Sequence, residues 1–112
     1  MSKEESNPAI ADASLPSQYS DGPLFPLGQV VATPGALEYC AKNNVSPLTL
    51  IGRHHRGDWG DLCDEDRVAN ENALFAGGRL FSSYRVGVGG EKLYCITEWD
   101  RSATTLLLAQ EY

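Results

Sequence analysis

The sequence predicts an α+β protein with one folded domain. The expected fold is an antiparallel β-sheet, made of a short N-terminal strand and a C-terminal three-strand meander, with about three helices packed on one face. Two Thr/Ser-Pro helix starts and one longer amphipathic stretch occupy the middle of the chain. Period-two alternation then runs through the last third. The 112 residues, 42% of them hydrophobic, suffice for one modest core.

Residues 1–23 are predicted to be a disordered N-terminal tail, and residues 24–112 to form the single domain. The tail carries Pro8, Pro16 and Pro23 among small, polar and acidic side chains, and its few apolar residues show no period. Such a segment cannot bury enough apolar surface to offset the entropy lost on ordering.

The ordered region is expected to begin at Leu24, and a short strand follows at residues 28–32, where valines follow Gly28 and Gln29. Thr33 and Pro34 then have the residue types of an N-cap and a first helical position, and predict a short helix. Ser46 and Pro47 repeat this arrangement, so a second short helix is expected to lead into Arg53 and His54.

The third predicted helix lies between Asp61 and the Gly77-Gly78 pair, with acidic residues in or near its first turn. At 100° per residue its apolar positions share one broad face, with Asn72 in the middle. These positions are Val68, Ala69, Ala73, Phe75 and Ala76. A buried amide needs partners, so Asn72 is expected to anchor a loop.

Three strands are predicted in the last third, at residues 79–86, 92–99 and 104–109. The glycine-rich segment 87–90 joins the first two as a hairpin turn. Asp100 is placed to open a tight turn between the second and third, because its carboxylate can accept backbone N–H groups two residues on.

The formal net charge of −6 and the pI of about 4.7 disfavour nucleic acid as a partner, because the nine basic residues are outnumbered by fifteen acids. Cys40, Cys63 and Cys95 have no metal-binding spacing and lie beside apolar residues, which predicts buried thiols in a reducing compartment. The sequence shows no export signal and no apolar run that could cross a membrane, so a cytoplasmic location is expected.

The stretch from Arg53 to Asp61 is the densest in reactive side chains, with two histidines, two arginines, two aspartates and a tryptophan. Adjacent histidines diverge on a helix end and rarely share an ion, so no metal site and no cofactor are predicted. The structural interpretation is a folded turn in which Trp59 fills the gap between helices and sheet, with Asp58 capping the next segment.

Two functional hypotheses follow. The leading one is a binding or regulatory protein that docks on another protein through an acidic, turn-rich face. The residues assigned to that face are Arg53, Asp58, Trp59, Asp61, Asp100, Arg101 and Ser102. The alternative is a small metal-independent hydrolase or ribonuclease-like enzyme, with His54 or His55 working beside Arg53, Glu98 and Arg101.

An open edge of the meander can also pair with a second copy of the chain, and the sequence does not identify which strand forms that edge.

The chain from Leu24 to Tyr112 also resembles a family of short, uncharacterised bacterial proteins often carried on plasmids and other mobile elements. The resemblance rests on LGQVVATPGAL at residues 27–37, on Arg53-His54 followed by Gly57-Asp58-Trp59-Gly60, and on ITEWDRS at residues 96–102 with Thr104-Thr105. It implies a small cytosolic accessory of mobile DNA, which modulates a nucleic-acid-processing system, and it implies no settled activity.

Overall fold

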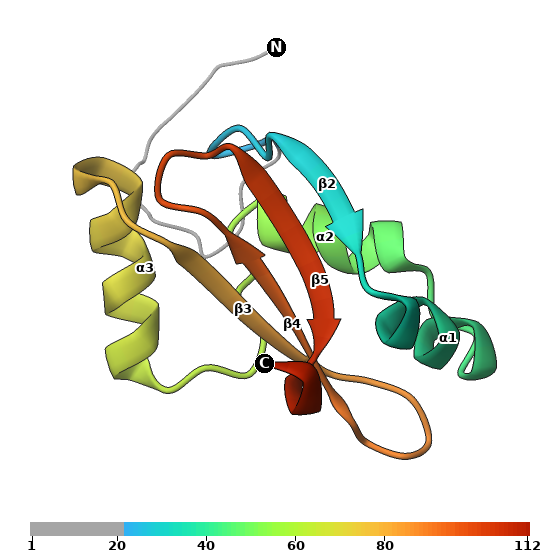
Figure 1. The fold of residues 1–112 in the computed structure, drawn as a ribbon. Helices are drawn as coiled ribbons and strands as arrows, with labels where there is room; N and C mark the ends of the chain where they lie inside the picture. Colours follow the sequence, from blue (N-terminus) through green and yellow to red (C-terminus); the bar gives the residue numbers. More distant parts are fainter. Residues whose placement is uncertain (1–21) are drawn as a thin grey trace, which may run out of the picture.

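The computed structural model describes residues 22–112 (Figure 1). The predicted disordered tail therefore lies outside the described residues, except for Gly22 and Pro23. The described part contains the helices α1 (Pro34–Lys42), α2 (Pro47–His55) and α3 (Asp64–Ala76), and the strands β2 (Gln29–Ala32), β3 (Leu80–Arg85), β4 (Lys92–Thr97) and β5 (Ala103–Leu108). A 3₁₀ turn, η2 (Ala109–Glu111), follows β5.

The four strands form one sheet in the order β2-β5-β4-β3, which confirms the predicted α+β class. The expectation of a fully antiparallel sheet is wrong, because β2 pairs with β5 in parallel while the other two pairs are antiparallel. The three helices carry the chain from β2 to the far edge, and the meander then returns strand by strand. β5 arrives beside β2 running in the same direction.

Both Pro-initiated helices form where the sequence predicts them. Thr33 Oγ1 accepts a hydrogen bond from the Ala36 N–H at 3.0 Å, and its own hydroxyl donates to Glu111 Oε1 at 2.7 Å. Ser46 stands at the N-cap of α2 but its side chain makes no capping bond. The proline thus marks the start of α2 without help from the serine hydroxyl.

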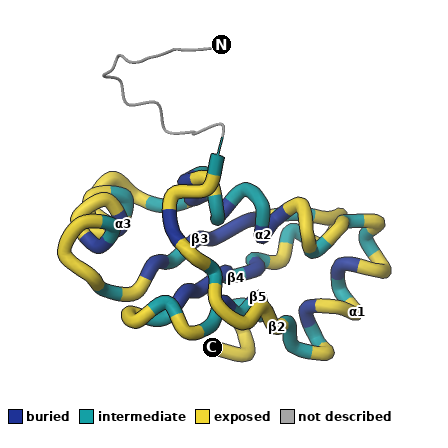
Figure 2. Tube along the Cα trace, turned by 90° about the horizontal axis from the view of Figure 1, so that it is seen from above, coloured by how far each residue is buried: buried dark blue, intermediate teal, exposed yellow. Residues whose placement is uncertain are grey.

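The helices do not all cover one face of the sheet. Figure 1 shows α2 behind the sheet and α3 beside β3, and Figure 2 shows α1 and α2 on the same side of the strands. The main core lies between these two helices and the inward-facing residues of β3, β4 and β5, among them Leu93, Cys95 and Leu106. A smaller cluster joins Phe25, Trp59, Ala73 and Leu80 near α3.

The broad contact face predicted for α3 is wrong: of its five apolar positions only Ala73 is buried. Val68 is 57% exposed and Phe75 is 90% exposed, whereas Asn70 and Ala73 are buried. Because α3 lies along the edge of β3 rather than over a sheet face, only a narrow stripe of the helix is covered. The anchoring amide is Asn70 and not Asn72: its Nδ2 donates to the Phe81 carbonyl at 2.7 Å, and its Oδ1 accepts from the Phe81 N–H at 3.0 Å.

Candidate functional site

A chain of buried hydrogen bonds runs through His54, at the end of α2. The imidazole Nδ1 lies 2.6 Å from Ser82 Oγ, and Nε2 lies 2.9 Å from Thr97 Oγ1. Thr97 Oγ1 in turn lies 2.7 Å from Thr104 Oγ1, whose hydroxyl donates to the Leu27 carbonyl at 2.8 Å. The chain therefore crosses β3, β4 and β5 on the inner face of the sheet and ends just before β2.

The Leu27 carbonyl, at the end of this series of hydrogen bonds, can only accept a proton. Because each hydroxyl has one proton to donate, this acceptor sets the direction of every other bond in the series. Thr104 uses its proton on the Leu27 carbonyl, so Thr97 must donate to Thr104. Thr97 Oγ1 then accepts the Nε2–H of His54, and the ring accepts the Ser82 hydroxyl proton at Nδ1. The side chain of His54 is therefore a neutral imidazole protonated at Nε2.

The burial of His54 opposes any positive charge on its ring. Its side chain is 0% exposed, and desolvation lowers its pKa to about 3, with further lowering by the charges of His55 and Arg101. Both ring nitrogens are occupied by hydroxyls of the sheet. An imidazole in this state neither accepts a proton near neutral pH nor reaches a substrate, so His54 acts as a structural link between α2 and three strands.

The loop after α2 is held by Arg53, Asp58 and Tyr84. Arg53 Nε donates to Asp58 Oδ2 at 2.6 Å, and the guanidinium carbon lies 4.5 Å from the centroid of the Tyr84 ring. The Tyr84 hydroxyl donates to the backbone carbonyl of Asp58 at 2.6 Å. Gly60 has a φ of 77°, and a Cβ there would overlap the Ser83 carbonyl and the Tyr84 ring. The close approach of this loop to β3 thus requires glycine.

Trp59 is the centre of the smaller core cluster. Its indole is 2% exposed, stacks on Phe25 with ring centroids 6.2 Å apart, and meets the His54 ring edge-on at 5.7 Å. This confirms the structural interpretation of the loop as a joint between helices and sheet. The docking role assigned to Trp59 is corrected by the same burial, because the indole cannot contact a partner while the loop is closed.

Arg101 holds the end of α3 and the β4–β5 turn together. Its Nη2 donates to the Ala73 carbonyl at 2.9 Å, and its Nη1 donates to the carbonyls of Gly78 and Glu98 at 2.5 and 3.1 Å. A third bond from Nη1 reaches the Trp99 carbonyl at 3.3 Å. The Ala73 carbonyl also accepts the Gly77 N–H at 3.0 Å, so the guanidinium binds its second lone pair at the helix C-terminus, where the partial negative charge of the helix favours a cation. The catalytic role predicted for Arg101 is therefore corrected, because its guanidinium N–H groups donate to backbone carbonyls.

The rest of the β4–β5 turn is shaped by two short-range contacts. Asp100 Oδ1 accepts the Ser102 N–H at 3.0 Å, as the sequence predicts, and its hydrogen bonds with Ser102 hold the Asp100 pKa below its usual value. The Ser102 carbonyl accepts the Gln29 N–H at 3.0 Å. Gly28 has a φ of 66° and packs against the backbone of Arg101 and Ser102, where a Cβ would overlap it.

The remaining predicted residues are not brought into one cavity. Asp61 is exposed and contributes its backbone, which donates to the Ser83 carbonyl at 2.6 Å. His55 is partly buried with its ring edge-on to Phe25 at 5.6 Å. Glu98 is half-buried, and its backbone carbonyl accepts from Arg101. The surface depressions beside α3 and between α1 and η2 are lined by neither the two histidines nor Glu98 and Arg101, so the convergence expected for the enzyme hypothesis is not seen there.

The sequence-based predictions assign no buried hydrogen-bonding or packing role to several residues that have one in the structure: Asn70, Phe25, Ser82, Thr97 and Thr104. Thr97 and Thr104 do share the inward phase of their strands with apolar neighbours, and a polar residue in that phase signals a buried hydrogen bond. Cys63 is a further correction, because this thiol is exposed at the N-cap of α3 while Cys40 and Cys95 are buried.

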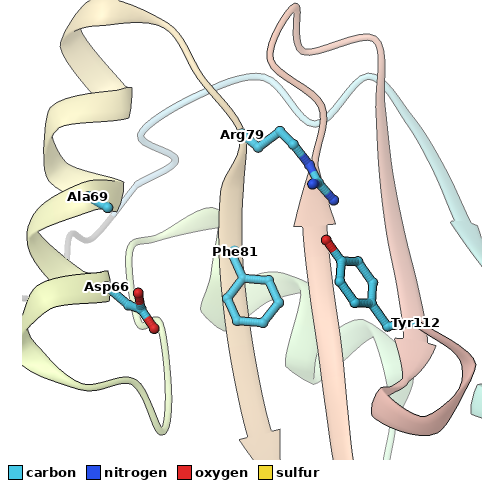
Figure 3. Close-up of a pocket in the computed structure, with 5 residues that line it drawn as sticks. All are labelled: Asp66, Ala69, Arg79, Phe81 and Tyr112. Carbon is cyan, nitrogen blue, oxygen red and sulfur yellow. The ribbon is translucent and has the colours of Figure 1, made fainter.

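Shallow depressions on the described surface include three that are lined by residues other than the catalytic candidates. One of about 310 Å³ lies between α3 and the outer face of the sheet, where Asp66 and Ala69 face Phe81, with Arg79 and Tyr112 at the far side (Figure 3). The second, of about 330 Å³, lies beside Trp59 and the first turns of α3, and the third, of about 280 Å³, lies between α1 and η2.

Within residues 22–112, no three His, Cys, Asp or Glu side chains are grouped as metal ligands. None of the described helices has the length and apolar character needed to cross a bilayer.

Two exposed aromatic residues stand at the end of the molecule that Arg101 holds. Phe75, in the last turn of α3, is 90% exposed, and Trp99, at the start of the β4–β5 turn, is 68% exposed. The Arg101 guanidinium bonds to Ala73 on one side and to the Trp99 carbonyl on the other. Both aromatic residues therefore belong to one cross-linked block, which we call the aromatic end.

Comparisons with protein families, with curated proteins and with solved structures find no match to this chain.

Proposed function

We propose that this protein is a small acidic regulatory protein that binds another protein through the aromatic end, Phe75 and Trp99. The observation that carries the proposal is the exposure of two large aromatic side chains on backbone that Arg101 holds in place. Aromatic residues dominate binding energy at protein interfaces. When their backbone is already ordered, association costs less conformational entropy.

The charges around the aromatic end favour a basic partner. Glu98 and Asp100 flank Trp99 in the sequence, and Glu71 lies one helical turn before Phe75 on the same side of α3. These three carboxylates make no ion pair among residues 22–112. The nearby cation, Arg101, is committed to backbone carbonyls. A partner surface with lysines or arginines around an apolar hollow complements this arrangement.

Direct binding of nucleic acid fits the structure less well. The chain has a net charge of −6. A basic patch would have to be formed by Arg53, Arg56, Arg79, Arg85 and Arg101, and of these Arg53, Arg85 and Arg101 bond to the protein's own groups. The resemblance to proteins of mobile elements suggests an indirect route. In this proposal the partner is a cytoplasmic protein of a nucleic-acid-processing system, encoded by the element or by its host.

The proposal is tested by changing each aromatic residue of the aromatic end and measuring capture. The tagged full chain is incubated with cell extract, and the most enriched protein is then purified and titrated directly. Trp99→Ala and Phe75→Ala should each weaken its binding at least tenfold, and raised salt should weaken it further. Val88→Ala is the matched control, because Val88 is 100% exposed in the β3–β4 turn and lies outside the aromatic end.

Thermal unfolding of the three variants shows whether a loss of binding reflects a loss of structure. All three side chains are mostly exposed, so we expect each variant to unfold within a few degrees of the parent. Binding that is equally strong in all four proteins, or that falls equally in Val88→Ala, would remove the aromatic end as the docking surface.

A further inference from the structure

The outer edge of β2 carries backbone polar groups that no described residue bonds. Gln29 N–H donates to the Ser102 carbonyl and Thr33 N–H donates to the Leu106 carbonyl, both at 3.0 Å. The register with β5 places Val31 between these two bonds, on the same side of the strand. The N–H and C=O groups of Val30 and Ala32 therefore point away from β5, and among residues 22–112 nothing meets them.

The same edge is apolar, neutral and accessible. Val30 is 42% exposed and Val31 is 40% exposed. Residues 22–37 contain no Asp, Glu, Lys or Arg, although the whole chain carries a net charge of −6. Figure 1 shows β2 at the margin of the sheet. The carboxylate that lies at the end of this edge is that of Glu111, which accepts the Thr33 hydroxyl at 2.7 Å. Since the strand itself carries no charged side chain, few like charges meet when two copies approach along it.

We infer that β2 is a self-pairing edge, at which two copies of the chain join their sheets antiparallel about a two-fold axis through Val31. In this register Val30 lies opposite Ala32 of the second copy, and the two residues exchange both of their backbone hydrogen bonds. Ala32 of the first copy and Val30 of the second exchange their two backbone hydrogen bonds in the same way. All four outward N–H and C=O groups of each strand are then satisfied, and a shift by one residue would satisfy none of them.

The side chains agree with this register. Val31 is in register with Thr105, so it lies on the outer face of the sheet, opposite the face that α1 and α2 cover. At the two-fold axis the two Val31 side chains form a non-hydrogen-bonded pair, the arrangement in which opposite side chains approach most closely. The two outer faces become one continuous surface, and α1 and α2 of both copies stay on the other side. An isologous contact of this kind closes after two copies.

The pairing strand has only four residues, so the contact is small and the dimer is expected to be weak and dependent on concentration. Sedimentation equilibrium of the full chain over a wide concentration range should show the mass rising from 12.2 kDa towards twice that value. Backbone hydrogen exchange should slow with concentration at Val30 and Ala32, at least tenfold. The amide of Val31, already bonded to β5 in a single copy, should be unaffected.

Substitutions at the two-fold axis test the register itself. Val31→Lys and Val31→Glu each place like charges opposite one another and should raise the dissociation constant at least tenfold. An equimolar mixture of the two variants should dimerise again, because opposite charges then meet. Thr105→Lys is the matched control, since Thr105 lies on the same face one strand further in and should leave dimerisation within twofold of the parent.

Three results would each overturn the inference: a parent chain that stays monomeric at every concentration, a mixture of the two Val31 variants that fails to associate, or a Thr105→Lys variant that loses the dimer as fully as Val31→Lys. Slowed exchange outside β2 would place the contact elsewhere and overturn it as well. Because the aromatic end takes no part in this contact, Trp99→Ala should dimerise like the parent, which separates this test from that of the proposed function.

Discussion

Strand β3, at one edge of the sheet, has a partner for each outward polar group of Phe81 and Ser83. Strand β2, at the other edge, has no partner for those of Val30 and Ala32 within residues 22–112. The Asn70 amide bonds both groups of Phe81. The loop at residues 59–61 bonds both groups of Ser83, with Ser83 N–H donating to the Trp59 carbonyl at 3.0 Å. The Asn70 side chain and this loop therefore make the backbone hydrogen bonds that a further strand would make at this edge.

The difference between the two edges indicates at which one another polypeptide chain can pair with the sheet. An unpaired edge strand is a template for another chain, and proteins commonly cover or charge such edges. Here the β3 edge is closed by parts of the same chain, and the β2 edge is left short, neutral and open. We expect substitutions at the closed edge to act on stability, and substitutions at the open edge to act on association.

Opening the closed edge should have the largest effect on folding. Asn70→Ala removes both bonds to Phe81 and leaves a part-buried N–H and C=O unpaired, so we expect a loss of about 2 to 4 kcal/mol in the free energy of unfolding. Asn72→Ala, on the exposed side of the same helix, should change it by less than about 0.5 kcal/mol. Urea unfolding of both variants measures the contrast. Equal losses would show that the Asn70 amide does not close the edge.

Lowering the pH should reduce the free energy of unfolding, because His54 is buried in its neutral form on the inner face of the sheet. The folded-state pKa of His54 is lowered to about 3, so only the unfolded chain takes up its proton as the pH falls below 6.5. Stability contributed by the neutral ring is therefore complete above pH 6.5 and is lost on the way down to pH 3. Between pH 6.5 and 5 the expected loss is roughly 2 kcal/mol, at about 1.4 kcal/mol per pH unit.

Unfolding free energies of the parent and of His54→Gln, measured between pH 7 and 5, check this expectation. The glutamine variant should have a lower free energy of unfolding at every pH, but that free energy should change much less with pH than in the parent. A slope that persists in the variant would assign the pH dependence to other groups and would contradict a neutral, hydrogen-bonded His54.

The smallest effect separates two adjacent serines of β3. Ser82 donates to His54 and faces the helices, while Ser83 Oγ is buried on the outer face without a partner among the described residues. Ser82→Ala leaves the Nδ1 acceptor unpaired and should cost about 1 to 2 kcal/mol, whereas Ser83→Ala should change stability by about 0.5 kcal/mol or less, or increase it. Thermal unfolding of the two variants side by side measures this difference. A larger loss of stability for Ser83→Ala would contradict the role of Ser82 as the hydrogen-bond donor to His54.

Much of the chain's local structure was predictable. Thr33 and Pro34 start α1, Pro47 starts α2, the glycines after Ala76 end α3, and alternation marks β3, β4 and β5. The candidate site was harder. The residue types of His54 and His55 indicate acid-base chemistry, but no local pattern indicates that His54 is buried among hydroxyls 28 and 43 residues away in the chain. Likewise, a broad contact face for α3 predicts a buried Asn72, whereas the narrow contact in the structure buries Asn70.

The sequence by itself determined the elements, the role of Trp59 as a joint between helices and sheet, and the acidic net charge, because caps, prolines, glycines and alternation act within a turn or two of the chain. Only the tertiary structure decided that β2 runs parallel to β5, that Asn70 closes one edge of the sheet, and that Arg101 joins the end of α3 to the β4–β5 turn. These outcomes depend on which distant groups meet. A hydroxyl such as that of Thr104, whose acceptor lies 77 residues away, carries no local sign of its partner.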